Sequence, residues 1–563
     1  MELRVKRVTR RDFLKGMLAT GVAAGSAGVL TACGSSSSTA VSDGEFQEVD
    51  TSELEFPLAE TATISGMISY PSGTDENISE RTIFKRIQEA ANVDVEWTAI
   101  QSDQWSDKIT LAMANLDTLT DFVFTASFGD ATLLKYAEQG VIIALEDYID
   151  AYMPNLTAVF EAYPDYKDMC VDENGHIWAL PWIEQLGTGK LAIQTVGNMG
   201  FINQKWLDFL GLDVPETVED FEEVVKAFRD NAAALQEEFD IDGDIIPISC
   251  IMNDGDQDPC MLINGFGEGY GDGDRGAHIA VTDDLEVIYS GAQEGFHSGI
   301  EWLHSLYEEG LIDPECFTHE WSTYVAKGKS GRYGVCFTWD IANVDNLTDW
   351  SVLPVLEADV RNFTPQNASF TSGFDRGRCV VTSVAENPAL VCAWLDQMYD
   401  PFQSPQNNWG TYGEDDDFDI FVLGENADGE PMLQHAELGD ASPVEVREAE
   451  AVGGPLAVLD DYYGVYVTKP DDAAYRLDWI EEYYTPYMNG DYVYPSILMT
   501  VEDTEELSNL QADITQLTNT KKSDWVMNGL TDADWDQYLS DLNAYGLEDY
   551  LALYQKYLDS YYA

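Results

Sequence analysis

The chain has 563 residues, of which 102 are Asp or Glu and 29 are Lys or Arg, so its formal net charge is −73. Such a charge repels nucleic acid and anionic lipid head groups, which excludes a nucleic-acid partner and disfavours anionic ligands unless a local basic pocket exists. The hydrophobic content of 45 % excludes general disorder, and the length is too great for one core, so at least two domains are expected.

The first 33 residues have the pattern of an export signal. Basic residues between Arg4 and Lys15 precede the apolar run 16–30, which at roughly 15 residues is shorter than the ~20 that a membrane-spanning helix needs. Arg10 and Arg11 resemble the twin arginines of a Tat signal. Residues 30–33 (LTAC) resemble a bacterial lipobox, in which Cys33 is lipidated and becomes the first residue of the mature protein.

A serine-rich stretch follows Cys33 and predicts a flexible tether over residues 34–55. The sequence therefore predicts a folded body that a lipid anchor holds at the outer face of the cytoplasmic membrane. The remaining seven cysteines are an odd number without a CxxC pair. They form neither a disulfide framework nor a zinc pattern, and we expect buried free thiols.

The body begins with alternating strands and helices. The pattern predicts strands at 61–70, 93–100 and 121–125 and helices at 78–91, 104–114 and 131–139. This alternation is typical of a parallel α/β layer, in which ligands bind beyond the carboxyl ends of the strands. The rule points to five residues as ligand-binding candidates: Tyr70, Gln101, Trp105, Ser127 and Phe128.

Several motifs carry a family resemblance. Residues 141–149 (VIIALEDYI) and 175–181 (GHIWALP) are followed by 200–221, by 331–340 (GRYGVCFTWD) and by 386–400. The end of the chain, 523–563, adds Trp525, Trp535 and a series of tyrosines. Together these motifs resemble the sugar-type (family 1) extracellular solute-binding proteins of bacterial ABC importers, in their large lipoprotein subgroup.

The resemblance implies a two-lobe type II periplasmic-binding-protein fold, the Venus flytrap, with three interlobe crossings. The expected division gives lobe 1 residues 56–181 and 337–384. Lobe 2 takes 182–336 and 385–563, the latter with a helical C-terminal extension. Such lobes close on a ligand by hinge motion.

Further candidates lie at the expected crossings. They are Trp178 and Trp182 at the first, Trp339 and Asp340 at the second, and Arg376 at the third. Flat aromatic rings suit the C–H faces of sugars, whereas carboxylates and amides suit their hydroxyl groups. Arg376 is expected either to orient a carboxylate of the ligand or to pair with Asp375. We expect Trp339→Ala to abolish binding and to leave the stability of the empty protein nearly unchanged.

Two segments of the sequence contain residues that could bind a metal ion. The loop with Asp240, Asp242 and Asp244 resembles a shortened EF-hand loop, but its sixth and twelfth positions are Ile245 and Ile251, so the EF-hand rule fails. The spacing of His297, Glu301 and His304 permits a metal site, but no signature surrounds it. The sequence predicts no metal and no cofactor.

The predicted function is a lipid-anchored substrate-binding subunit of an ABC transporter. It captures a carbohydrate, an oligosaccharide, in an interlobe cleft and delivers it to the transmembrane permease subunits. Two alternatives stay open. The acidic charge suits a peptide-binding or cationic-solute-binding protein on the same fold. The many carboxylates suit a secreted glycoside hydrolase, although that enzyme needs two carboxyl groups roughly 5–9.5 Å apart, a distance that sequence does not give.

Overall fold

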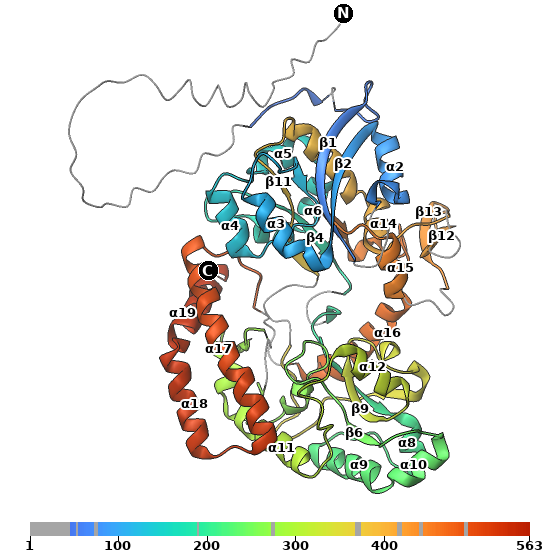
Figure 1. Cartoon of the computed structure of the whole chain (residues 1–563), viewed down its shortest axis with the longest axis vertical. Coiled ribbons are helices and arrows are strands. Elements are labelled where there is room, and N and C mark those ends of the chain that lie inside the picture. Colours follow the sequence, from blue (N-terminus) through green and yellow to red (C-terminus); the bar gives the residue numbers. More distant parts are fainter. Residues whose placement is uncertain are drawn as a thin grey trace, which may run out of the picture. The chain divides into compact units, whose positions relative to one another are not determined.

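The computed structural model describes residues 46–51, 54–71, 77–187, 191–271, 276–365, 373–413, 419–437, 443–488 and 494–562. The predicted signal, Cys33 and the first part of the tether lie outside these residues. The chain forms two compact units (Figure 1). Unit 1 comprises Met1–Ile183 and Asp375–Thr468, and unit 2 comprises Glu184–Phe374 and Lys469–Ala563. The chain thus passes from one unit to the other three times, as the predicted fold requires.

The positions of the second and third passages differ from the expected ones. Residues 337–374 belong to unit 2 rather than to the first lobe, because the strand that ends at Thr338 pairs with two other strands of unit 2. Residues 385–468 belong to unit 1 rather than to the second lobe. There the carboxylate of Asp396 accepts hydrogen bonds from the backbone N–H groups of Asn155 and Leu156.

A six-stranded sheet in the order β14-β4-β11-β3-β1-β2 organises unit 1. Its strands are β1 (Ala62–Tyr70), β2 (Val93–Gln101), β3 (Phe122–Val123), β4 (Leu180–Glu184), β11 (Phe374–Val381) and β14 (Leu456–Val458). β1 pairs in parallel with β2 and with β3, and β11 runs antiparallel to β3. The predicted parallel layer is therefore present, and an antiparallel strand extends it.

Aromatic packing explains a glycine inside β1. The rings of Trp97 and Phe122 lie beside Gly66, where an added Cβ would come within 2.7 Å and 2.6 Å of them. The same rings pack against Phe84 and Trp394, with the centroids of Phe84 and Trp97 4.6 Å apart. Any larger residue at position 66 would push this buried cluster away from the sheet.

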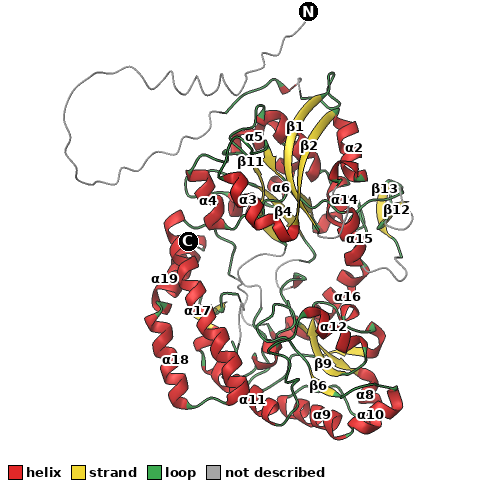
Figure 2. Ribbon diagram, in the orientation of Figure 1, coloured by secondary structure: helices red, strands yellow, loops and turns green. Residues whose placement is uncertain are grey.

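Helices flank the strands of unit 1 (Figure 2). They are α2 (Thr82–Ala91), α3 (Trp105–Met113), α4 (Asp130–Glu138), α5 (Glu146–Tyr152), α6 (Pro154–Ala162), α7 (Pro164–Cys170), α13 (Pro388–Asp396), α14 (Gln403–Trp409) and α15 (Pro443–Glu450). A separate hairpin joins β12 (Phe421–Glu425) to β13 (Pro431–His435).

Unit 2 contains a four-stranded sheet in the order β10-β5-β9-β6. Its strands are β5 (Met199–Asn203), β6 (Ile246–Ile248), β9 (Tyr333–Thr338) and β10 (Trp350–Val352), and a second hairpin joins β7 (Ile279–Val281) to β8 (Val287–Tyr289). The helices are α8 (Gln204–Leu210), α9 (Val218–Asp230), α10 (Ala232–Phe239), α11 (Glu294–Glu308), α12 (Trp321–Lys329), α16 (Asp471–Trp479), α17 (Val501–Asn528), α18 (Asp532–Ala544) and α19 (Leu547–Tyr561).

The last three helices form the C-terminal extension. Thr531 and Asp534 make a capping box at the start of α18, and Gly546, with φ 92°, separates α18 from α19. α17 packs along α11 and α19 (Figure 1). The hydroxyl groups of Tyr538 and Tyr289 meet the hydroxyl group of Thr518 at 2.8 and 2.6 Å, which ties this extension to the core of unit 2.

None of the helices among the described residues is sufficiently long and apolar to cross a membrane. The seven cysteines from Cys170 to Cys392 are free and buried, as the sequence predicts.

Candidate functional site

A cavity of about 520 Å³ lies in unit 1 at the carboxyl ends of its parallel strands. The described residues that line it are Ile68, Ser69, Tyr70, Pro71, Arg81, Ser102, Trp105, Thr125, Ser127, Arg378, Arg447, Glu448, Ala451, Val452 and Gly453. The loops that follow β1, β2 and β3 supply one part of the wall, and β11 and the segment from α15 onward supply another.

Three of the candidates from the sequence line this cavity: Tyr70, Trp105 and Ser127. Tyr70 is the last residue of β1, and Trp105 is the first residue of α3, which follows β2. Ser127 has φ 45°, a left-handed conformation that is uncommon for a residue other than glycine. Strained residues of this kind concentrate at functional sites.

Three arginines that no sequence pattern pointed to also line the cavity: Arg81, Arg378 and Arg447. They are conspicuous because the whole chain has only 29 Lys and Arg residues against 102 Asp and Glu. The scarcity of basic residues was thus the available signal. It could not be used without a fold, because the three positions lie far apart in sequence.

Arg378 reaches the cavity from β11. Its Nη1 donates a 2.9 Å hydrogen bond to the hydroxyl group of Ser127, and its Nε donates to the carbonyl oxygen of Gly454 at 3.2 Å. The carboxylate of Asp375 lies 3.7 Å from Nη1. Burial lowers the pKa of Arg378, the charge of Asp375 opposes this shift, and the positive charge of Arg447 adds to it.

The other two arginines hold the segment around α15. Arg447 donates from Nε and Nη2 to the carbonyl and side-chain oxygens of Asn408, each at 2.7 Å. Arg81 donates to the carbonyl oxygens of Ala451 and Glu448. The guanidinium groups therefore fix backbone around the cavity.

Gln101 and Phe128 are near the strand ends but are not among the residues that line the cavity. Gln101 ends β2, and its side-chain oxygen accepts a 3.4 Å hydrogen bond from Gln104. Phe128 is buried against Tyr136, and its N–H donates to the carbonyl oxygen of Gly377. A Cβ at Gly377 would lie 2.0 Å from the carbonyl oxygen of Phe128, so the two backbones touch there.

The remaining candidates of unit 1 have internal partners. Trp178 is buried and donates from Nε1 to the carboxylate of Asp172 at 2.8 Å. Arg376 is also buried and forms an ion pair with Asp130, at 2.9 Å. Neither is among the described residues that line the cavity, and ligand binding by either stays a prediction.

Trp182 lies in β4 and is connected to the cavity wall through one shared residue. Its Nε1 donates to the side-chain oxygen of Asn408 at 3.4 Å, the same atom that accepts from Arg447. Trp182 thus supports an arginine of the cavity.

Trp339 and Asp340 follow β9 in unit 2. The guanidinium carbon of Arg476 lies 3.9 Å from the centroid of the Trp339 ring, so one face of that ring is covered. Arg476 is buried, and this burial lowers its pKa to about 10. Asp340 accepts hydrogen bonds from Ala342 N–H and from the hydroxyl group of Tyr475.

The carboxylates of Asp240, Asp242 and Asp244 are not among the described groups whose ligand atoms lie within 4.8 Å of one another. Asp240 ends α10 in a left-handed conformation, and the carbonyl oxygen of Asp244 accepts a 2.9 Å hydrogen bond from Arg332. His297 stacks on Trp535 with 4.8 Å between the ring centroids, and His304 hydrogen-bonds to the carbonyl oxygen of Val526. The helix face singled out in the sequence is therefore a packing surface.

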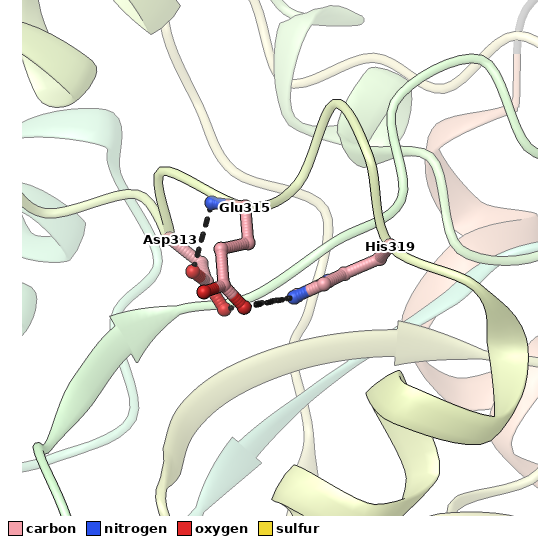
Figure 3. A group of neighbouring side chains, drawn as sticks. All are labelled: Asp313, Glu315 and His319. Carbon is pink, nitrogen blue, oxygen red and sulfur yellow. Dashed lines mark hydrogen bonds and ion pairs between the residues drawn. The ribbon is translucent and has the colours of Figure 1, made fainter.

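A different group in unit 2 has the spacing of a metal site. Ligand atoms of Asp313, Glu315 and His319 lie within 4.8 Å of one another (Figure 3). The ammonium group of Lys327 already occupies this position, at 3.0 Å from Asp313, 2.6 Å from Glu315 and 2.8 Å from His319. Because an ammonium group can only donate, His319 accepts through Nε2, and the lysine takes the place of a cation.

Comparison with known proteins identifies the family. The family model for bacterial extracellular solute-binding proteins matches residues 70–297. The chain is 39 % identical, over 95 % of its length and 96 % of the relative's, to FusA of Streptococcus pneumoniae serotype 4, a fructooligosaccharide ABC transporter substrate-binding protein.

Solved structures agree with this match. The structure of S. pneumoniae FusA in complex with kestose has a TM-score of 0.81 and 39 % identity, and the match covers 89 % of this chain and 99 % of FusA. A solute-binding protein of Bifidobacterium longum infantis associated with an HMO-binding ABC transporter has a TM-score of 0.71 at 21 % identity, with 89 % and 99 % covered, and shows the shared fold. The predicted two-lobe fold and the predicted family are confirmed: this chain belongs to the bacterial extracellular solute-binding proteins.

Proposed function

We propose that this protein is the substrate-binding subunit of an ABC importer and that it captures an oligosaccharide for delivery to the permease. The observation that carries the proposal is the 39 % identity to the fructooligosaccharide-binding FusA over nearly the whole of both chains. The cavity in unit 1 adds aromatic side chains and hydrogen-bonding groups at the strand ends, as a sugar site requires.

The ligand-binding residues that we propose in unit 1 are Tyr70, Trp105 and Ser127, and in unit 2 we propose Trp339. The ligand leaves unaltered, because this function needs no catalytic group. Among the described residues that line the cavity, Glu448 alone carries a carboxylate, whereas a glycoside hydrolase needs a pair. The three arginines of the cavity disfavour a polyamine or another cationic solute despite the acidic surface.

The test uses the soluble body from Ser35 onward and isothermal titration calorimetry with kestose, nystose and longer fructooligosaccharides. Cationic peptides and spermidine serve as controls. We expect saturable binding of the oligosaccharides, a rise in melting temperature and recovery of intact sugar on chromatography. Binding of the cationic solutes alone, or release of shorter sugars, would contradict the proposal.

We further propose that Cys33 carries a lipid and that the protein is held at the outer face of the cytoplasmic membrane. The support is the order of basic residues, apolar run and LTAC sequence before the serine-rich tether. The anchor would keep the binding protein close to its permease and raise its effective concentration there.

A further inference from the structure

The cavity of unit 1 has an imbalance of charge that the proposed function does not explain. Two of its lining residues, Arg378 and Arg447, carry positive charges near enough for one to lower the pKa of the other. Asp375 lies 3.7 Å from Arg378, and Arg447 is bound to a neutral asparagine. The lining thus holds three guanidinium groups against one carboxylate, that of Glu448, with Asp375 beside Arg378, and such groupings of like charge concentrate at functional sites.

Each of the two guanidinium groups has one terminal nitrogen that makes no hydrogen bond to the described residues. Nε and Nη1 of Arg378 are used by Gly454 and Ser127, and Nε and Nη2 of Arg447 are used by Asn408. Nη2 of Arg378 and Nη1 of Arg447 have no hydrogen-bond partner among the described residues. The used donors fix the two groups, so the remaining donors have defined positions.

The surrounding backbone leaves room for this arrangement. Gly453 has φ 61°, and an added Cβ would lie 2.7 Å from Nη2 of Arg378. Ser127, in its left-handed conformation, places its hydroxyl group to accept from Nη1 of the same arginine. Two unusual backbone positions therefore flank one guanidinium group.

We propose, on the basis of the proposed function, that Arg378 and Arg447 determine ligand specificity by donating hydrogen bonds to oxygen atoms of the bound sugar. The chemistry they recognise is a set of neighbouring oxygen acceptors on one sugar ring. Such acceptors come from adjacent hydroxyl groups of a neutral sugar or from the carboxylate of a uronate. Trp105 and Tyr70, which line the same cavity, offer apolar surface to the ring.

The test compares wild-type protein with Arg378→Lys and Arg447→Lys, which keep the charge and lose the planar fork of donors. Affinity is measured by titration calorimetry for neutral kestose and for anionic trigalacturonate, at low and high salt. Because hydrogen bonds from charged donors are lost, each variant is expected to bind whichever of the two sugars the wild type binds on the order of 10- to 100-fold more weakly than the wild type does. The matched control is Arg332→Lys in unit 2. Arg332 also donates from Nε to a backbone carbonyl oxygen, and the sugar affinity of this variant should equal that of the wild type.

The outcomes separate this inference from the proposed function. Weaker kestose binding by both variants, with little salt dependence, supports the inference and identifies hydroxyl acceptors. Tighter trigalacturonate binding that salt and both variants weaken supports it and identifies a carboxylate. Wild-type affinity in both variants, with circular dichroism showing folded protein, overturns the inference and leaves the importer function intact. Absence of sugar binding by the wild-type protein overturns both the inference about the two arginines and the proposed oligosaccharide-binding function.

Discussion

At the scale of single residues, Trp339 is more firmly built into unit 2 than its sequence position suggests. The guanidinium group of Arg476 packs against one face of its ring and also donates to its carbonyl oxygen and to that of Val196. Removing the ring would strip a buried cation of an aromatic partner, a contact of about 2 kcal/mol where water is excluded. The sequence-based expectation of an unchanged stability is therefore revised.

We expect Trp339→Ala to abolish oligosaccharide binding and also to lower the free energy of unfolding by about 2 kcal/mol. Trp339→Phe keeps a flat ring over Arg476 and should retain most of both properties. Calorimetric titration and urea denaturation measure the two effects separately. Sugar affinity that survives in Trp339→Ala would remove this residue from the proposed site.

Asp396 makes the stability of unit 1 depend on pH. Burial raises its pKa from 3.8 to about 6, although the N–H groups of Leu156 and Asn155 at the start of α6 oppose the shift. A folded pKa above the unfolded one means that the proton binds the folded state more tightly. The stabilisation is complete below about pH 4 and is lost as the pH rises through about 6.

Asp396→Asn cannot titrate and still offers an oxygen to the helix. We expect the stability of the wild type relative to this variant to fall by roughly 2–3 kcal/mol between pH 4 and pH 7, since one pKa unit corresponds to about 1.4 kcal/mol. Urea denaturation at each pH gives the free energy of unfolding of both proteins. Their difference isolates the titration of Asp396, because all other titrating groups are the same in the two proteins. A constant difference across this range would contradict the raised pKa.

Some of the candidate residues line the described cavity and others do not, and the reason is local. A strand end specifies which loop reaches the site but not which side chain of the loop turns inward. Tyr70 and Ser127 therefore line the cavity, whereas Phe128 packs on Tyr136. Arg376 was a candidate because it lies at the expected third crossing, but Arg378, two positions along the same strand, lines the cavity.

At the scale of elements, the alternating pattern before residue 140 predicted the strands and helices of unit 1 closely. The predicted strand at 93–100 is observed at Val93–Gln101, and the predicted helix at 131–139 at Asp130–Glu138. The helical segment after Thr217 is divided into α9 and α10, because Asn231 interrupts it with φ −104° and ψ 17°. Periodicity detects an apolar face but does not show a break between two helices that present the same face.

The helix α12 is secured to the preceding loop by Lys327. This ammonium group lies among Asp313, Glu315 and His319, and the side chain of Asp313 is only 3 % exposed. Lys327 also lowers the pKa of Glu315 through a direct hydrogen bond. Removing the lysine would leave a buried carboxylate without its counter-charge.

We expect Lys327→Met to destabilise the protein by about 3 kcal/mol, as for other buried ion pairs that lose one member. The matched control is Lys226→Met in α9, whose ion pairs with Glu222 and Glu309 are more exposed and should contribute no more than about 1 kcal/mol. Thermal and urea unfolding of both variants provide the comparison. Equal effects would show that burial of the cluster does not matter.

At the scale of the whole molecule, the sequence predicted the presence of more than one domain better than the points at which the chain passes between them. Composition predicted more than one domain, and the chain forms two compact units. The exclusion of anionic partners stays a prediction. The three passages between units were predicted in number, but two were placed incorrectly. The choice depends on long-range pairing, such as β9 with β5 and β6, which no local pattern records.

The proposed lipid anchor is tested on the full-length chain. We expect Cys33→Ala to move the protein from the membrane fraction to the medium and to remove labelling by radioactive palmitate, because no acyl chain can then be attached. Cys170→Ala, at a buried cysteine of α7, is the control and should stay anchored. Membrane retention of Cys33→Ala would contradict lipidation at this position.

The strand order of unit 1 also bears on how the protein is made. β11 lies between β4 and β3 in the finished sheet, although it is encoded after nearly two hundred residues that belong to unit 2. A nascent polypeptide emerging from the ribosome must therefore hold β1 to β4 in an incomplete sheet until Phe374–Val381 has been synthesised, and the edge strand β14 comes later still. During that interval the exposed flanks of β3 and β4 are open to aggregation, so premature termination before residue 374 should yield insoluble fragments rather than a free-standing first domain.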